Sequence, residues 1–412
     1  MKARDQRSAR YELAANTIED REIEAAVAVL RSGQLTMGER VRAFEEAFAA
    51  WVGAEHALMV NSGSSANLLA IETRLRGVRD DPRRWRPGDE VLVPALAWPT
   101  TVWPIAQLGL VPVLVDVEPS TLAIDLRSAE SMIGPRTVGM VLIHVLGQPP
   151  PMDRYVGFCA EHRLTLIEDA CESLGAQSQG RHVGTFGETG TFSTYFSHHI
   201  TTIEGGVVVT SDRAVFDDLR SMRSHGWVRD RLDRREIALA SSAFDDRFLF
   251  ATTGYNVRPT ELNAAIGLVQ LDRLPSMLAS RAELAAFVSR LVEPIPWIRL
   301  VGAETLSADD VLAQGWRSHS WMTLPFEVAS GAPASAAKVA DLLEDSDIET
   351  RPVIAGNLAR HPAMDQIVSR RAASLAVADR VLSQFFMIGC HPNASDAHLY
   401  TLQAGFERLA AL

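Results

Sequence analysis

The sequence predicts an α/β fold with a large domain built on a mostly parallel, seven-stranded sheet and a smaller α+β domain at the C-terminal end. Two observations predict it. Short apolar runs rich in Val, Ile and Leu alternate with stretches of helical periodicity over the first two thirds of the chain. The runs are almost continuously apolar, which is typical of strands that are covered on both faces. Strands that alternate with helices form parallel sheets through right-handed crossovers.

The elements are predicted in the following order. Residues 1–14 are polar and basic and are expected to fray, within an N-terminal arm placed at residues 1–25. Helical periodicity begins at Asn16, and the Ser-Gly-Gln-Leu-Thr-Met-Gly segment at 32–38 divides it into two helices. The large domain is predicted to span 26–285 and the small domain 286–412. Seven predicted strands lie at 57–60, 91–94, 111–117, 139–145, 164–169, 191–195 and 207–210.

The composition excludes several classes of protein. The chain has 412 residues, of which 47% are hydrophobic and 22% are charged, as in an ordinary globular protein. Its net charge of −11 argues against binding to nucleic acid. No window approaches the ~18 apolar residues of a membrane span, and the first residues lack the apolar core of a secretory signal. We therefore expect a cytoplasmic enzyme.

Cysteine and lysine are both scarce. The three cysteines, Cys159, Cys171 and Cys390, have no spacing that would hold zinc or an iron–sulfur cluster, so no metal is expected. A sparse, odd number of cysteines suits a reducing compartment. Of the 40 basic residues, only Lys2 and Lys338 are lysines. Chemistry that requires a lysine amine therefore has only two candidate residues.

Three motifs carry candidate chemistry. Asn-Ser-Gly-Ser-Ser-Ala-Asn at 61–67 follows a predicted strand and opens a helix, so its N–H groups suit a phosphate, although a serine cap and turn would look the same. At 167–173, Asp169 ends a predicted strand, where ligands bind in open α/β sheets, unless it only caps the next helix. A polar loop within 190–209 carries two adjacent histidines and a Gly-Gly turn between two predicted strands.

In combination these motifs resemble those of the sugar aminotransferase family, fold-type-I pyridoxal phosphate enzymes that act on nucleotide-linked 4-keto sugars. The resemblance runs from about residue 11 to residue 392. It implies pyridoxal 5′-phosphate or pyridoxamine 5′-phosphate as cofactor, and a homodimer with shared active sites. Further segments that carry it lie at 32–38, 88–98, 223–226, 254–267 and 350–362.

The resemblance also implies which residues bind the cofactor. Gly63, Ser64 and Ser193 are expected to hold the phosphate, and Asp169 to pair with the protonated ring nitrogen. Trp98 is expected to stack on the ring, with a core aromatic as the alternative.

Other residues are implied at the rim of the site. Glu172 is expected near the cofactor's 3-hydroxyl, although a first-turn carboxylate of a helix is an equal explanation. Asn256 is expected to reach the phosphate from the neighbouring subunit. The expected substrate-binding residues are Thr36, His225 and Arg351. The fork of Arg351 matches a carboxylate, with a surface ion pair as its alternative role.

One position departs from the family's pattern. The aminotransferases carry a lysine five residues after the phosphate-binding serine and bind the cofactor covalently through it, whereas this chain has His198 there. Neither Lys2 nor Lys338 is placed to replace that lysine. An imidazole titrates near about pH 6.5 and is a good general base. The exchange is similar to that in the 3-dehydratases of deoxysugar pathways, nearest to those acting on GDP-4-keto-6-deoxymannose.

This resemblance implies a 3-dehydratase that holds its cofactor non-covalently, uses His198 as base, consumes L-glutamate and releases 2-oxoglutarate and ammonia. A related CDP-sugar dehydratase carries a cysteine-ligated [2Fe–2S] cluster, for which this chain has no ligands. Two other classes stay open: an ordinary sugar aminotransferase, and a non-catalytic regulator on a degenerate aminotransferase scaffold. The nucleotide also stays open among GDP, CDP, dTDP and UDP. No nucleic-acid or membrane partner is expected.

Overall fold

A central eight-stranded sheet organises the computed structural model, which describes residues 9–78, 81–241, 244–303 and 307–412. Within this sheet β9 runs antiparallel to both neighbours, and every other adjacent pair is parallel. All seven predicted strands are present and the mostly parallel sheet is confirmed, but the predicted count of seven strands is corrected to eight by β13, a two-residue strand from the C-terminal part of the chain. The order is β1 (His56–Val60), β9 (Gly206–Thr210), β8 (Thr189–Ser193), β5 (Thr165–Asp169), β4 (Thr137–Ile143), β2 (Glu90–Pro94), β3 (Val111–Val115) and β13 (Arg370–Arg371).

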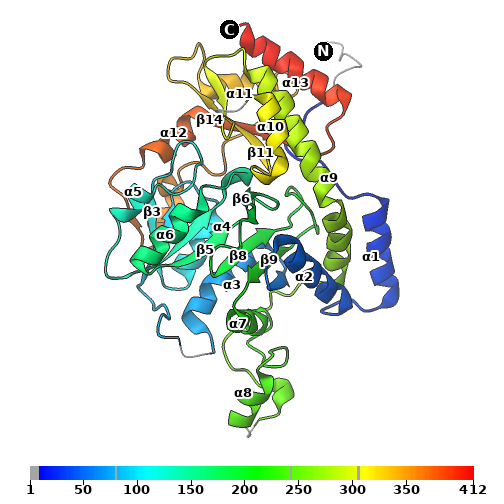
Figure 1. Cartoon of the computed structure of the whole chain (residues 1–412), viewed down its shortest axis with the longest axis vertical. Helices are drawn as coiled ribbons and strands as arrows, with labels where there is room; N and C mark the ends of the chain where they lie inside the picture. Colours follow the sequence, from blue (N-terminus) through cyan, green and yellow to red (C-terminus); the bar gives the residue numbers. More distant parts are fainter. Residues whose placement is uncertain (1–8, 79–80, 242–243, 304–306) are drawn as a thin grey trace.

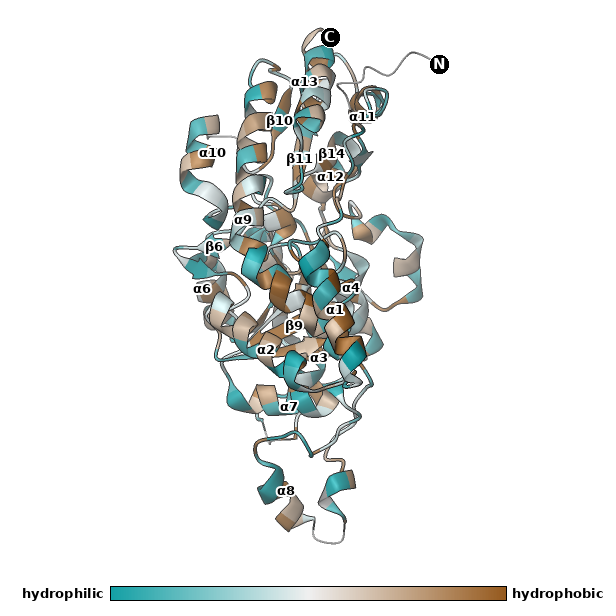
Figure 2. Cartoon of the chain, turned by 90° about the vertical axis from the view of Figure 1, so that its right-hand side faces the viewer, coloured by the Kyte–Doolittle hydropathy of each residue, from teal (hydrophilic) through white to brown (hydrophobic). Residues whose placement is uncertain are grey.

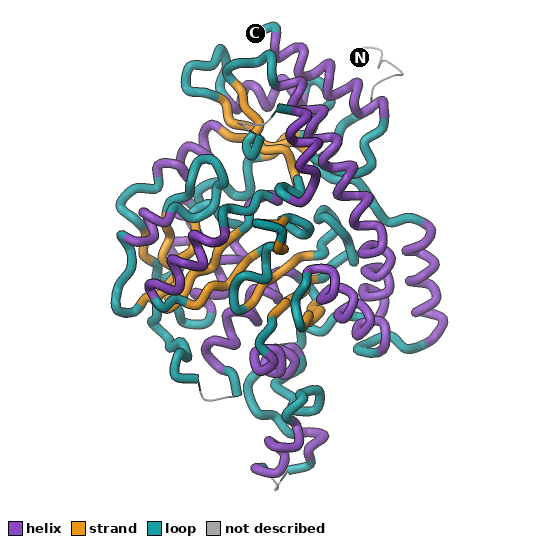
Figure 3. The backbone as a smooth tube through the Cα atoms, viewed as in Figure 1, coloured by secondary structure: helices purple, strands orange, loops and turns teal. Residues whose placement is uncertain are grey.

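Helices cover both faces of this sheet (Figure 3). Alternate residues of one strand pack into different cores: Leu58 and Val60 belong to one apolar cluster, whereas Ala57 and Met59 belong to another, with Phe48. The apolar runs were continuous because both faces of each strand are buried. The helices of this region are α2 (Glu39–Val52), α3 (Gly63–Arg76), α4 (Pro99–Gln107), α5 (Leu126–Glu130), α6 (Met152–His162) and α7 (Arg213–Arg223).

The N-terminal segment is docked from residue 9 onward, which corrects the expectation that residues 9–14 fray. Tyr11 is fully buried, its backbone bridges to Ile348, and its hydroxyl donates to the Gly389 carbonyl at 2.9 Å. The expected fraying of residues 1–8 lies outside the described residues. After this segment α1 (Asp20–Ser32) packs against α9 (Glu261–Val292).

A second, four-stranded antiparallel sheet forms the upper part of the molecule (Figure 1). Its order is β10 (Ile298–Leu300), β11 (Thr323–Val328), β14 (Phe385–Gly389) and β12 (Thr350–Arg351). Four helices accompany it: α10 (Ala308–Gln314), α11 (Ala336–Glu344), α12 (Ala376–Gln384) and α13 (Asp396–Ala410). The division at residue 285 stays a prediction. The long helix α9 crosses that point without a break, and β13 joins the large sheet.

A hairpin and several short helices complete the described chain. Figure 2 shows apolar residues gathered around β9, while the segment carrying α8 (Arg234–Ala240) hangs below them. No helix among the described residues is long and apolar enough to cross a membrane. The remaining elements are β6 (Gln177–Ser178), β7 (Arg181–His182), η1 (Val145–Gly147), η2 (Asp246–Phe248), η3 (Gly315–Arg317), η4 (Leu358–Arg360) and η5 (Pro362–Gln366).

Candidate active site

Three of the predicted cofactor-binding residues meet at one edge of the large sheet. Asp169 ends β5 and Ser193 ends β8, and these parallel neighbours finish at the same edge. Gly63 opens α3 directly behind Ser193: a Cβ at Gly63 would lie 2.7 Å from the Ser193 Cβ and 3.2 Å from the Cys171 Sγ. Only glycine permits so close an approach. The structure therefore brings Gly63, Asp169 and Ser193 together.

The first turn of α3 has the features of an anion site. Ser62 caps the helix and accepts from the Ser65 N–H, and the Asn61 N–H donates to the Val257 carbonyl. The N–H groups of Gly63 and Ser64 belong to the helix start, where no intrahelical acceptor exists. The positive end of the helix dipole favours an anion at this point.

Asp169 is held rigidly by neutral donors. Its Oδ2 accepts from Asn67 Nδ2 at 2.8 Å and from Thr101 Oγ1 at 2.7 Å, and its Oδ1 accepts from the Cys171 N–H at 3.1 Å. The Asn67 amide is fixed in turn by the Thr191 hydroxyl at 2.5 Å. Sequence reasoning missed Asn67 and Thr101 as supports of the carboxylate.

The charge of Asp169 has no cationic partner. The residue is only 4% exposed, and within the described parts of the chain no basic side chain forms an ion pair with it. A buried carboxylate is normally paired with a cation or surrounded by hydrogen bonds. The Asp169 site thus has its hydrogen bonds in place and lacks a cation.

Trp98 and Glu172 lie beside this edge and differ in character. Trp98 is the residue before α4 and is 55% exposed, so it is not the core aromatic that was its alternative. Glu172 accepts from the Leu146 N–H at 3.0 Å. Burial raises the pKa of Glu172 to about 7, and the negative charge of Asp169 adds to this effect. Glu172 is therefore a carboxyl group that titrates near neutral pH.

His198 lies in the loop that connects β8 to β9. Its N–H donates to the Tyr195 carbonyl at 3.0 Å, and its ring meets the Tyr195 ring edge-on at 6.0 Å between centroids. The ring retains partial contact with solvent, but Nδ1 is buried without a hydrogen-bond partner. Desolvation lowers the pKa of His198 to about 4, against an opposing influence from Asp169. The imidazole is therefore neutral at physiological pH.

No lysine among the described residues takes the place of His198. Lys338 is an exposed residue of α11, and Lys2 lies outside the described residues. Among the residues with structural description there is also no group of three His, Cys, Asp or Glu side chains that could hold a metal ion. The three cysteines are free thiols.

The remaining predicted residues form a second group and one isolated position. Thr36 bridges to Thr260, Asn256 bridges to Ser224, and the His225 N–H donates to the Tyr255 carbonyl at 2.7 Å. This group adjoins the first through the Asn61–Val257 bond described above.

Arg351 stands apart on β12. Its side chain is 65% exposed and lies 3.7 Å from Glu349. No hydrogen bond or ion pair within the described ranges joins Arg351 to another predicted site residue.

A buried layer supports the site from behind. His144 Nε2 lies 2.8 Å from Glu168 Oε2, and both side chains are fully buried. Glu168 also accepts from the N–H groups of Gly184 and Gly187 at 2.9 and 2.6 Å. Sequence reasoning missed this pair, although His144 directly follows β4 and Glu168 lies within β5. The pair fixes the ends of β4 and β5, where Asp169 stands.

Comparison with known proteins gave concordant results. The model of the DegT/DnrJ/EryC1/StrS aminotransferase family matches residues 16–405. GDP-4-keto-6-deoxy-D-mannose 3-dehydratase of Yersinia pseudotuberculosis is 35% identical, covering 85% of this chain and 86% of that protein. The dTDP-4-dehydro-2,6-dideoxy-D-glucose 3-dehydratase of Saccharopolyspora spinosa is 33% identical, covering 88% of this chain and 78% of that protein. A solved GDP-4-keto-6-deoxymannose-3-dehydratase with a trapped PLP-glutamate geminal diamine superposes with a TM-score of 0.87 at 31% identity, covering 96% of this chain and all of that one.

Proposed function

Because the chain belongs to the DegT/DnrJ/EryC1/StrS aminotransferase family, we propose that it is a pyridoxal phosphate-dependent 3-dehydratase of a nucleotide-linked 4-keto-6-deoxyhexose. The net reaction removes the C3 hydroxyl of the sugar, converts L-glutamate to 2-oxoglutarate and releases ammonia. The oxygen lost by the sugar balances the oxidation of glutamate, so no external reductant is needed. The names of two similar proteins, both 3-dehydratases of nucleotide-linked sugars, support this assignment.

The residues at the sheet edge fit the cofactor. A protonated pyridine nitrogen would supply the cation that the buried Asp169 lacks, and the α3 N-terminus with Ser193 would receive the phosphate. The exposed face of Trp98 would be covered by the ring. When bound, the cofactor supplies an amine carrier and an electron-withdrawing ring.

His198 carries the proposal. Desolvation holds the pKa of His198 at about 4, so the ring is neutral at physiological pH and has a free nitrogen lone pair. The position suits a base and does not suit a covalent tether, since imidazole forms no stable bond with an aldehyde. We propose that His198 takes and returns the proton at the reacting carbon, with a contribution of roughly 10²–10⁴ to the rate. The cofactor is then held by non-covalent contacts alone.

The two alternative functions, an ordinary sugar aminotransferase and a non-catalytic regulator, have less support. A covalent aminotransferase needs a lysine at the site, and Lys338 is an exposed residue of α11. A non-catalytic regulator would have no need for an unpaired buried carboxylate, which is costly to maintain. The support of Asp169 by Asn67, Thr101 and the Cys171 N–H therefore favours an enzyme.

The co-substrates would meet the rim of the site. Arg351 has a side chain that is largely exposed and only loosely paired with Glu349, so its guanidinium is available to the carboxylate of glutamate. Thr36 and His225 are proposed to contact the nucleotide sugar. Glu172, whose pKa of about 7 allows it to donate or accept, is proposed to bind the 3-hydroxyl of the cofactor.

We propose a cytoplasmic homodimer with shared sites. Three large apolar side chains of the loop that carries His198 are exposed: Tyr195, Phe196 and Ile203. Several exposed apolar side chains in one short loop are typical of an interaction surface. Asn256 is exposed, and its Oδ1 accepts from Arg258 Nε at 2.8 Å; it is proposed to reach the partner's phosphate site.

The test is incubation with GDP-, dTDP-, CDP- and UDP-4-keto-6-deoxyhexoses, each with L-glutamate and pyridoxal phosphate. A product lighter than the substrate by one oxygen atom supports the proposal and identifies the nucleotide. An amino sugar in its place assigns the chain to the aminotransferases. Absence of any conversion, with glutamate also unchanged, would favour the regulator.

A further inference from the structure

His199, which follows His198 in the chain, is buried and hydrogen-bonds to a segment far away in the sequence. The residue is 1% exposed, and its Nε2 lies 3.0 Å from the Ser320 carbonyl, 121 positions away in the chain. A carbonyl only accepts, so Nε2 carries the proton, and Nδ1 is buried without a partner. Desolvation and then the charge of Arg281 lower the pKa of His199 well below its ordinary value. His199 is therefore a neutral donor that ties the loop of His198 to the segment at 319–322.

Hydrogen bonds from several elements fix the backbone of the segment at 319–322. The N–H groups of Ser320 and Met322 donate to the carbonyls of Gly147 and Leu146 at 2.9 and 3.0 Å. Arg281 Nη1 donates to the carbonyls of Trp321 and Met322 at 3.2 and 3.0 Å. Contacts from η1, from α9 and from His199 therefore converge on three consecutive residues.

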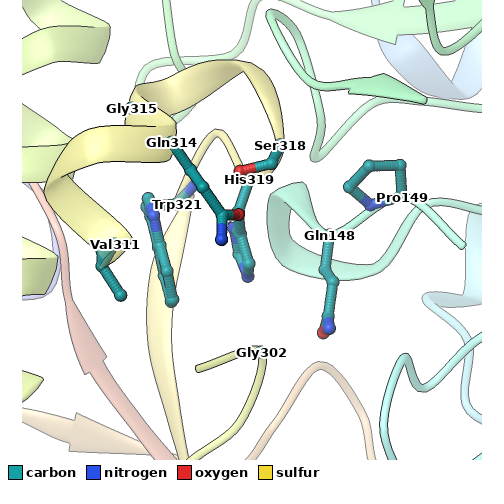
Figure 4. Close-up of a pocket in the computed structure, with 9 residues that line it drawn as sticks. All are labelled: Gln148, Pro149, Gly302, Val311, Gln314, Gly315, Ser318, His319 and Trp321. Atoms are coloured by element: carbon teal, nitrogen blue, oxygen red, sulfur yellow. The ribbon is translucent and has the colours of Figure 1, made fainter. Parts of the chain in front are cut away.

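The backbone of this segment is strained. Trp321 has a φ of +48°, a left-handed conformation that costs a non-glycine residue energy. The Trp321 N–H donates to Nδ1 of His319 at 3.1 Å, and the two rings stack at 3.6 Å. Figure 4 shows these rings side by side at a small cavity of about 100 Å³, which Gln148 also lines. Strain that surrounding contacts over-determine is a feature of sites where geometry serves function.

We infer that His199 is a positioning residue: its Nε2–H bond to the preorganised Ser320 carbonyl fixes the loop that presents His198. The inference rests on the proposed function in one respect, the role of His198 as base. Other hydrogen bonds from the loop to distant elements begin at Thr201: its N–H donates to Gln270 Oε1 at 3.2 Å, and Asn263 Nδ2 donates to the Thr202 carbonyl at 2.7 Å. His199 is the anchor directly beside His198. The His198 N–H bonds within the loop, to Tyr195, and the described His198 ring has no hydrogen bond to other elements.

A pair of substitutions separates anchoring from mere burial. The amide nitrogen of glutamine reaches about as far as Nε2 of histidine, whereas that of asparagine reaches only as far as Nδ1. His199→Gln should therefore keep the bond to Ser320, and His199→Asn should lose it. Since a displacement of about 1 Å can cost about 10²-fold in rate, the Asn variant should lower kcat for dehydration about 10- to 100-fold, with KM within a factor of three. The Gln variant should stay within about threefold of the parent.

Hydrogen–deuterium exchange of the cofactor-free protein provides a readout independent of activity. Amides of residues 195–201 should exchange faster in His199→Asn and at the parental rate in His199→Gln. His162→Asn is the control: the His162 ring is also largely buried, with Nε2 2.8 Å from a Glu130 oxygen, but it lies at the end of α6. Exchange in 195–201 should not change in that variant.

Gly147→Ala tests the anchor from the opposite side. A Cβ there would lie 2.6 Å from the Trp321 N and 2.8 Å from the Ser320 Oγ, so it should displace the segment without touching His199. Faster exchange of 195–201 in Gly147→Ala would support the inference even where His199→Asn fails to fold. Parental exchange in all folded variants would overturn it. If the parent dehydrates no sugar, the proposed function fails, and the exchange results still decide whether His199 anchors the loop.

Discussion

Asp169 and the loop of His198 face the same edge of the sheet but are built differently. Three donors from three parts of the chain fix the Asp169 carboxylate, and the Asn67 amide among them is itself fixed by Thr191. The His198 ring has a buried Nδ1 without a partner, and the side chains of Tyr195 and Phe196 next to it are exposed. The Asp169 carboxylate therefore has its hydrogen bonds in place, whereas the described His198 ring has a buried nitrogen without one.

The difference indicates a division of labour. A group that must keep one charge throughout a reaction gains from rigid hydrogen bonds, since these stabilise the ionised form. A group that takes a proton from a substrate must be neutral and have a free lone pair before the transfer. Asp169 fits the first description and His198 the second. The substitutions below test whether binding and proton transfer separate in this way.

The largest expected effect concerns proton transfer. His198→Asn should lower kcat for sugar dehydration by about 10² or more, because asparagine cannot act as a base. The cofactor Kd, measured by absorbance titration, should change less than threefold. His162→Asn should alter neither quantity. Full dehydration by the His198→Asn variant would remove His198 from the mechanism.

The next effect concerns binding. Asp169→Asn keeps the shape of the side chain and removes the charge that would pair with the ring nitrogen. A charged hydrogen bond contributes about 1.5–3 kcal/mol, so the cofactor Kd should rise roughly 10- to 100-fold. Asp153→Asn, an exposed position on α6, serves as the matched control. An unchanged Kd in Asp169→Asn would show that the carboxylate does not meet the cofactor.

Glu172 provides a test by pH. Its pKa is raised from 4.5 to about 7 in the folded protein, so between about pH 4.5 and 7 the folded state binds more protons than the unfolded state. The contribution of Glu172 to stability is therefore present at low pH and lost as the pH rises through 7. The free energy of unfolding of the parent, relative to Glu172→Gln, should fall by about 1–3 kcal/mol over this range. Urea unfolding of the cofactor-free proteins at several pH values measures it, and a flat difference would contradict the shifted pKa.

The smallest effect is expected at a support of Asp169. Thr101→Val removes one donor to the carboxylate with little change of shape. One hydrogen bond contributes about 1 kcal/mol, so the cofactor Kd should rise about fivefold. Thr100→Val is the neighbouring control, since the Thr100 hydroxyl makes no described bond to Asp169. Equal effects of both substitutions would mean that the Thr101 bond has no specific role.

Local patterns predicted the strands, but the predicted strands at 111–117, 139–145 and 191–195 end two residues beyond β3, β4 and β8. The runs at 91–94 and 207–210 appear as β2 and β9 within one residue at their starts, because a strand buried on both faces is apolar along its length. Asp169 could be placed at the sheet edge because it ends its predicted strand. Ser193 was predicted in the middle of a strand at 191–195, whereas β8 ends at Ser193. The replacement of the family's lysine by His198 could also be seen in the sequence, because it requires only counting five residues from Ser193.

Contacts between distant segments could not be predicted. The donors to Asp169 lie 102 and 68 positions away, at Asn67 and Thr101, and nothing in their own surroundings identifies that partner. Tyr11 was assigned to a frayed segment because its neighbours are polar, yet it docks against Ile348 and Gly389. Side-chain pairing of this kind depends on the three-dimensional arrangement of the elements, which local periodicity does not contain.

The central claim is that the enzyme consumes glutamate to remove the C3 oxygen of a nucleotide-linked 4-keto sugar. One measurement tests it most directly: quantifying 2-oxoglutarate, ammonia and 3-deoxy sugar together during turnover. The account predicts a ratio of one to one to one, without any added reductase. An amino sugar formed with no ammonia released, or a strict requirement for a reductase, would contradict it.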